Sequence, residues 1–228
     1  MFNHNFVAVP KLVQQTQNDG VRRYVTPEGH AYESVTTFIS RNWDKTGLKK
    51  WEKRLGFKAA DKERIRTSTR GKSLHSSIES YLMNEKVIID DPVKKSVFIN
   101  IKPALHRINN IRLLEKPLYS NELQLAGTPD AISDFDDDLA VIDFKTSNKI
   151  KKRIWIVHHF LQAACYAVMY NEHFKTMPQK AVIIMAVENE HQPVVYVEPM
   201  RGCILALKEF IKDPIQFQKD VIKKVPVA

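Results

Sequence analysis

Two aspartates lie on either side of a short acidic turn. Asp130 precedes and Asp143 follows Asp136 and Asp137, with strand-forming residues on both sides of the turn. A two-residue hairpin turn at Asp136 and Asp137 places Asp130 opposite Asp143, with Cβ atoms roughly 5 Å apart. Because side chains alternate along a strand, Lys145 falls on the same face as Asp143. The spacing predicts a patch that joins two carboxylates and one amine.

Two like charges at this distance repel each other unless a cation lies between them. Carboxylates, water and phosphate oxygens are the ligands that Mg²⁺ and Mn²⁺ prefer. We therefore expect Asp130 and Asp143 to hold a divalent metal ion. The alternative, from these residues alone, is an exposed hairpin in which Lys145 only neutralises Asp143.

Two further pairs of polar residues are each four positions apart, which is about one helical turn. His75 and Glu79 share a face of a helical stretch upstream of the aspartates, and Gln162 and Tyr166 share a flank of a helical stretch downstream. An imidazole ligand is compatible with Mn²⁺. A plain surface role is open for Glu79, and an interior polar role is open for Gln162 and Tyr166.

Hydrophobic periodicity arranges these residues along a series of elements. Residues 21–25 and 30–35 predict a small hairpin, and Ser34 is placed to cap a short helix that ends near Ile39. Helices are predicted over 44–66, 69–84, 92–109, 157–174 and 200–212, and strands over 112–119, 123–134, 139–146, 180–187 and 193–198. This order predicts an α/β fold with a mixed central sheet flanked by helices.

Composition excludes several classes of protein. A chain of 228 residues with 43% hydrophobic and 27% charged residues is typical of one globular domain, not of a disordered chain. The longest apolar run, residues 181–187, is too short to span a bilayer, so we expect no membrane association. Two cysteines are too few to ligate an iron–sulfur cluster, so none is expected.

Positive charge is concentrated in one segment. The net charge is +9, and residues 45–72 contain eleven Lys or Arg but only three acidic residues. Trp51 lies among these bases, and a second basic group, residues 149–153, follows the acidic hairpin. Bases interleaved with aromatics favour binding of nucleic acid through phosphate contacts and stacking. The other interpretation is a solvated helical face with Trp51 turned into the core.

Taken in order, these motifs resemble those of the PD-(D/E)XK nuclease superfamily. The matching set is His75 on a helix, Gly127-x-x-Asp130, a hairpin, Asp143-x-Lys145, and Gln162-x-x-x-Tyr166 on the next helix. The histidine and the Gln-x-x-x-Tyr motif are similar to the RecB-like exonuclease branch, and within it to the mitochondrial genome maintenance exonucleases, over residues 34–200. The resemblance implies a restriction-endonuclease-like core, with an N-terminal helical addition, that hydrolyses phosphodiester bonds.

The resemblance also assigns roles to individual residues. Mg²⁺ or Mn²⁺ would be held by the side chains of His75, Asp130 and Asp143 and by the backbone carbonyl of Phe144. Lys145 would orient or deprotonate the attacking water, or stabilise the charge that develops on the phosphate. Gln162 and Tyr166 would contact the scissile phosphate or the water. Glu79 and Glu115 are candidates for outer-sphere contacts, and a surface ion pair is equally open for Glu115. The residues expected to bind DNA are Lys49, Lys50, Trp51, Lys53, Arg70, Lys72, Thr146, Ser147, Lys151 and Lys152.

We expect one nuclease domain over residues 1–228, with a hairpin and basic helical region (1–68), a core (69–200) and a C-terminal helix and tail (201–228). The expected activity is a metal-dependent DNA exonuclease acting at single-stranded ends or flaps, in replication, repair or recombination. The alternatives are a duplex-resecting or structure-specific nuclease with the same site, and a nucleic-acid-binding module without catalysis. Residues 1–10 show neither a signal core nor an arginine-rich transit pattern, so we expect a cytoplasmic protein of a bacterium or a phage-infected cell, with the mitochondrial matrix as the less favoured alternative.

Overall fold

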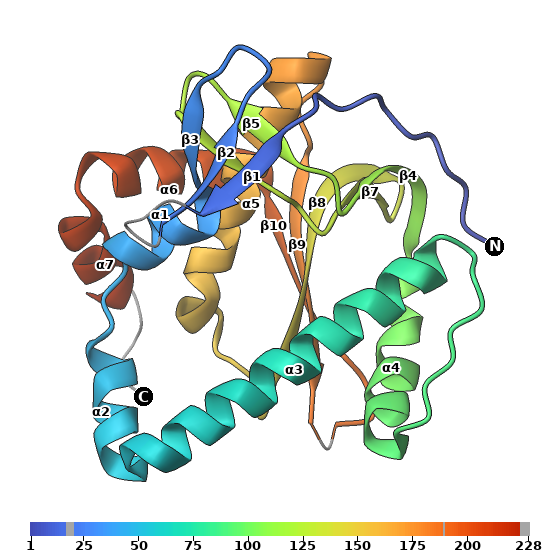
Figure 1. Ribbon diagram of the computed structural model, residues 1–228, viewed down its shortest axis with the longest axis vertical. Helices are drawn as coiled ribbons and strands as arrows, with labels where there is room; N and C mark the ends of the chain where they lie inside the picture. The colour runs from blue at the N-terminus through green and yellow to red at the C-terminus, as the bar shows by residue number, and fades with distance from the viewer. Residues whose placement is uncertain (17–20, 189, 224–228) are drawn as a thin grey trace.

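The computed structural model describes residues 1–16, 21–188 and 190–223 (Figure 1). Its central sheet is mixed and has the strand order β10-β9-β8-β7-β4. These strands are β4 (Ile108–Leu114), β7 (Ala131–Phe135), β8 (Asp138–Ser147), β9 (Lys180–Val187) and β10 (Val194–Pro199). β8 and β9 run parallel and the other neighbours antiparallel. The predicted α/β fold with a mixed central sheet is confirmed.

Helices cover both faces of this sheet. One face carries α3 (Phe57–Leu82) and α4 (Pro92–Leu105); the other carries α5 (Val157–Phe174) and α6 (Met200–Lys212), with α7 (Pro214–Lys223) beside α6. A short 3₁₀ helix, η1 (Arg153–Ile156), leads into α5. No helix in the described part of the chain combines the length and the apolar character that a membrane span requires. Of the predicted C-terminal helix and tail, residues 224–228 lie outside the described residues.

The two faces of the sheet bury separate hydrophobic clusters. Ile142 and Phe144 of β8 pack with the α3 and α4 side, whereas Val141 packs with α5. This confirms the predicted alternation along β8. Asp143 is two residues after Val141 on the same strand, so its side chain also points toward the α5 side.

A second, smaller sheet has the order β1-β2-β3-β6-β5. Its strands are β1 (Val13–Thr16), β2 (Arg22–Val25), β3 (Ala31–Ser34), β5 (Leu118–Ser120) and β6 (Leu125–Gly127). The predicted hairpin is β2–β3, and the predicted Ser34 cap is confirmed, since its hydroxyl accepts a hydrogen bond from the N–H of Thr37 at the start of α1 (Val35–Asn42). The prediction of continuous strands over 112–119 and 123–134 is wrong. The first run passes from the central sheet to the smaller sheet at Glu115, which has a positive φ of 48°. The second run passes back to the central sheet at Pro129, which has no N–H to donate.

The helical region before the site also differs from its prediction. A break was expected after residue 66, but the chain breaks at Gly56, whose φ of 85° favours glycine, between α2 (Thr46–Leu55) and α3. No residue of α2 is buried, and the first half of α3 buries only Ala60. We call α2 and residues 57–69 of α3 the basic arch. In Figure 1 the arch stands off the body of the molecule, at the lower left.

Candidate active site

The hairpin between β7 and β8 has the predicted register. Asp136 and Asp137 have positive φ values of 47° and 65°, as a type I′ turn requires, and aspartate tolerates this conformation better than most residues. Ala131 pairs with Ile142, so the next position outward holds Asp130 and Asp143. The carboxylate of Asp130 accepts a hydrogen bond from the N–H of Phe144, at 2.7 Å. This bond fixes the Asp130 side chain against the end of β8.

His75 reaches the same place from α3. Its Nε2 lies 2.7 Å from the carbonyl oxygen of Phe144. A carbonyl can only accept a hydrogen bond, so Nε2 carries the proton. The lone pair of the neutral ring is then on Nδ1, which lies 3.6 Å from a carboxylate oxygen of Glu115 and 3.6 Å from one of Asp130. The backbone of β8 thus sets the histidine tautomer and aims a ligand atom at two carboxylates.

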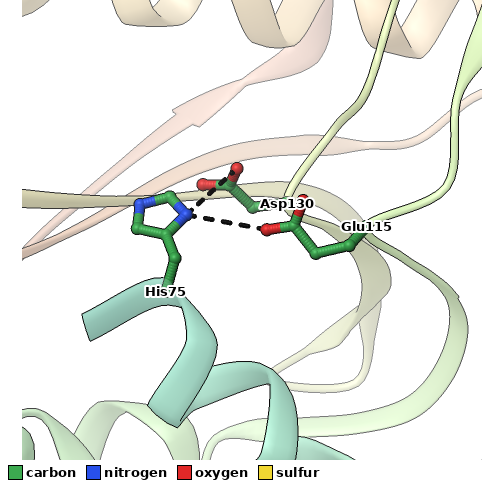
Figure 2. Close-up of side chains that lie close together, drawn as sticks. All are labelled: His75, Glu115 and Asp130. Atoms are coloured by element: carbon green, nitrogen blue, oxygen red, sulfur yellow. Dashed lines mark ion pairs between the residues drawn. The ribbon is translucent and has the colours of Figure 1, made fainter. Parts of the chain in front are cut away.

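Glu115 enters the site through an unusual backbone conformation. It follows the last residue of β4 in the left-handed region, and its N–H donates a hydrogen bond to the carbonyl of Asp130, at 3.0 Å. A non-glycine residue held in this region is costly and persists only where its surroundings enforce it. Here the kink turns the carboxylate of Glu115 toward His75 (Figure 2).

His75, Glu115 and Asp130 each offer one ligand atom, and these three atoms lie within 4.8 Å of one another. Figure 2 shows the three side chains pointing toward a common centre. Beside them, Oδ1 of Asp143 forms an ion pair with Nζ of Lys145, while Oδ2 of Asp143 is buried without a hydrogen-bond partner among the described residues. Clustered carboxylates, an imidazole lone pair and an orphaned buried oxygen fit a divalent cation such as Mg²⁺ or Mn²⁺.

The charges of these groups are strongly coupled. Burial and the neighbouring charge of Asp143 raise the pKa of Asp130 to about 6, against the opposing effect of Lys145 and His75. Burial works to lower the pKa of Lys145, but the carboxylates of Asp143 and Asp130 outweigh it and leave that pKa raised. Burial also works to lower the pKa of His75, but the carboxylates of Glu115 and Asp130 outweigh it and leave that pKa raised. Lys145 is therefore an ammonium ion near neutral pH.

The α5 side of the site is made by residues four positions apart. Nε2 of Gln162 lies 3.4 Å from the hydroxyl of Tyr166, and burial raises the pKa of Tyr166, so it remains a neutral phenol. A Cβ on Gly127 would lie 3.0 Å from that hydroxyl, which explains the glycine of the Gly-x-x-Asp motif. One turn earlier on α5 lies His158, which the sequence analysis did not single out. Its spacing of four from Gln162 is the signal that could have identified it.

The profile of the PD-(D/E)XK nuclease superfamily matches residues 21–220. The chain belongs to this superfamily. The resemblance drawn from the ordered motifs is confirmed.

Two relatives of this nuclease-superfamily chain are mitochondrial genome maintenance exonuclease 1 of Homo sapiens and of Mus musculus. The human protein is 26% identical over 169 residues, 67% of this chain and 48% of its own length; the mouse protein is 27% identical over 121 residues, 51% and 36%. The chain thus spans half or less of the relatives it matches. The crystal structure of SSO0001 matches 81% of this chain and 75% of that chain at 16% identity, with a TM-score of 0.38, too low to carry an argument.

Arg70 belongs to a network of ion pairs and hydrogen bonds that supports the candidate active site. Its side chain is buried, ion-paired with Glu188 and hydrogen-bonded at 2.8 Å to the side-chain oxygen of Asn148. Arg66 joins the same network through Glu63 and Glu188, at 2.8 and 2.7 Å. This network ties α3 to the ends of β8 and β9, one turn before His75. The guanidinium of Arg70 thus lies inside the fold, away from the surface position that its expected phosphate contact requires.

The other residues expected to bind DNA occupy different environments. Exposed side chains belong to Lys49, Lys50, Lys53, Lys72 and Lys152, and partly buried ones to Trp51, Thr146 and Lys151. Ser147 is buried, and its hydroxyl donates a hydrogen bond to the carbonyl of Lys149, at 2.6 Å. Glu79 is exposed. The carbonyl of Phe144, expected to bind the metal, accepts hydrogen bonds from His75 and, at 3.3 Å, from Lys145. The structure brings together His75, Glu115, Asp130, Asp143 and Lys145. The lysines of the arch are not part of this cluster.

Proposed function

We propose that the protein is a metal-dependent DNA nuclease that hydrolyses phosphodiester bonds. The observation that carries the proposal is the convergence of the His75 lone pair and the carboxylates of Glu115 and Asp130 beside the Asp143–Lys145 pair. These residues, with Asp143 adjacent, would hold Mg²⁺ or Mn²⁺. A bound ion would lower the pKa of a coordinated water and neutralise charge on a phosphate oxygen.

The protein residues around the ion have complementary tasks. The ammonium group of Lys145 is oriented by Asp143, so it can donate hydrogen bonds to a phosphate oxygen or to the attacking water. Because its pKa is raised, Lys145 holds its proton near neutral pH and acts as a donor rather than a base. Gln162 offers an amide, and Tyr166 a neutral hydroxyl, from the α5 side. Together they would position a phosphate for attack by water.

The basic arch supports a preference for single-stranded DNA. Lys49, Lys50 and Lys53 are exposed on α2, and the arch continues along α3 toward His75. A flexible single strand can follow such a helical surface with its phosphates, whereas a rigid duplex has to clear the arch before it reaches the carboxylates. We therefore propose an exonuclease that acts at single-stranded ends or flaps, which would serve DNA replication, repair or recombination.

The test uses oligonucleotides blocked at one end or the other, single-stranded and duplex, with Mg²⁺, Mn²⁺ or EDTA. We expect shortening of single strands from an unblocked end in the presence of metal, and none in EDTA. Shortening of duplex alone would support the resecting alternative, and cleavage of circular single strands an endonuclease. Tight binding with no cleavage under any metal would indicate a binding module and overturn the proposal.

A further inference from the structure

A groove of about 880 Å³ lies where the basic arch leaves the body of the molecule. Three segments line it: residues 41–44, just before α2; Lys152, Ile154 and Trp155, which follow β8; and the face of α7 that carries Ile215 and Ile222. We call it the Trp155 groove. These segments are far apart in the sequence, so the groove exists only in the folded chain.

The chemistry of the Trp155 groove combines an apolar, aromatic floor with a basic edge. Trp155 is 51% exposed, and Ile215 and Ile222 are 67% and 65% exposed, although each is a large apolar side chain. Arg41, Lys152 and Lys219 contribute three exposed cations to the same lining, of which Arg41 is ion-paired with Glu33 at 2.9 Å. Exposed aromatic surface bordered by cations suits a nucleobase and its phosphate.

One carboxylate, Asp44, also lines the groove. It accepts hydrogen bonds from the N–H and the hydroxyl of Thr46, at 2.8 and 2.6 Å, and these bonds lower the pKa of its carboxyl group, so it stays negatively charged. The cations of Arg41, Lys152 and Lys219 outnumber this charge in the lining. Lys152 lies near the ring of Trp155, with Nζ 6.0 Å from the ring centroid.

The Trp155 groove adjoins the candidate active site. The ring of Trp43, part of its lining, lies 5.3 Å from the ring of His158 between centroids. His158 lies one turn before Gln162 on α5, and it is close enough to Asp143 and Lys145 to feel their charges. The Trp43–His158 contact thus connects the lining of the groove to the α5 side of the site, and a strand that reaches both would pass His158.

We propose that the Trp155 groove is a base-binding subsite for single-stranded DNA, in which Trp155 stacks on a nucleobase and Arg41 and Lys152 contact adjacent phosphates. This inference rests on the proposed nuclease function and deepens it. It assigns recognition to the base as well as to the backbone, at a place separate from the lysines of α2.

Binding of fluorescent oligothymidine to the full chain in EDTA, where no hydrolysis is expected, tests the proposal. We expect Trp155→Ala to weaken binding by roughly 5- to 100-fold, the range for loss of one stacked base, and Trp155→Phe to retain most of it. An oligonucleotide of the same length with abasic sites should bind the parent and Trp155→Ala alike. Ile99→Ala, on the distant helix α4 and also 51% exposed, is the matched control and should change nothing.

A second pair of variants guards against a folding artefact at Trp155. Ile222→Glu places a negative charge in the groove, and Val93→Glu places one at a site on α4 with the same 65% exposure. Weaker binding by Ile222→Glu alone supports the subsite. If Trp155→Ala and Ile222→Glu bind oligothymidine as the parent does, or if Trp155→Ala loses abasic DNA equally, the subsite is overturned while nuclease activity of the parent still stands. A parent that neither binds nor cleaves DNA would instead overturn the nuclease proposal itself.

Discussion

The two halves of α3 belong to one continuous helix but have opposite surroundings. The second half buries Arg70, Leu74, Ile78 and Leu82 against the sheet and α4. The first half buries only Ala60 and exposes large apolar side chains, such as Phe57 at 74%. The boundary is the ion-pair network of Arg66 and Arg70 with Glu188. One half of the helix is held by packing, and the other is presented to solvent.

This difference matches two kinds of work. A metal ligand must be fixed within a fraction of an ångström, and His75, the proposed ligand, lies on the packed half and is hydrogen-bonded to the backbone of β8. Phosphate contacts act through charge and tolerate variation in distance, so the lysines can lie on the exposed basic arch. We therefore expect substitutions in the packed half to change catalysis or stability, and substitutions of the arch lysines to change only binding.

The largest effect is expected at Asp143, which forms an ion pair with Lys145 in the candidate active site. Asp143→Asn removes the charge with little change in volume, so turnover of single-stranded DNA should fall by about 10³-fold while binding in EDTA is kept. Asp138→Asn, on the same strand and 44% exposed, is the matched control and should cleave normally. A folded Asp143→Asn protein that loses binding together with cleavage would show a structural role instead.

The next largest effect is expected from disrupting the ion-pair network at the boundary between the two halves of α3. Arg70→Met keeps most of the aliphatic stem but leaves Glu188 with fewer partners, so the free energy of unfolding should fall by about 3 kcal/mol. Lys53→Met, on the arch, should change it by less than about 0.5 kcal/mol. Urea denaturation measures both. Equal stability of the two variants would remove the distinction between the anchored and exposed halves.

A pH-dependent effect should appear at Asp130. Its pKa is raised to about 6 in the fold, so the stability gained from its protonated form is present at low pH and is lost as the pH rises through 6. In EDTA, Asp130→Asn should therefore stabilise the protein above pH 6, on the order of 1 kcal/mol, with a smaller gain near pH 4. Thermal unfolding across pH 4–8 measures the difference. A gain that is the same at every pH would contradict this origin.

A smaller effect, confined to binding, is expected for the arch lysines. Replacing Lys49, Lys50 and Lys53 with Gln should weaken single-stranded DNA binding and reduce the log–log salt slope by about 0.7 for each phosphate that is no longer neutralised. Turnover at saturating substrate and the melting temperature should stay near the parent values. A triple Gln variant at Lys86, Lys95 and Lys208, all exposed and outside the arch, is the control for net charge. If the two triple variants bind single-stranded DNA equally well, the arch lysines do not guide the DNA strand.

The smallest change is expected at Trp51, which is partly buried on α2. If its ring stacks on a base, Trp51→Ala should weaken binding by about fivefold without altering the salt slope, because stacking releases no counterions. If the ring instead stabilises the arch, the melting temperature should fall and the salt slope should change with it. Titrations at several salt concentrations separate these outcomes.

Much of the central architecture could be predicted because its signals are local. The turn chemistry of Asp136 and Asp137 gives the register of β7 and β8, and the amphipathic patterns over 157–174 and 200–212 match α5 and α6 residue for residue. The continuous strands were the weakest prediction. Whether a run stays in one sheet depends on where its next partner lies, and the sequence around Glu115 and Pro129 carries no periodic signal of the change of sheet.

The sequence by itself predicted which residues could hold a metal ion, and it determined the face shared by Asp143 and Lys145 and the superfamily to which the chain belongs, because these follow from spacing along single elements. Only the tertiary structure decided how separate elements meet. It brought Glu115 beside His75 through a left-handed backbone residue, and it turned Arg70 inward to Glu188. Such placements depend on packing between elements distant in the sequence, and no local pattern records which face of a helix a neighbour will cover.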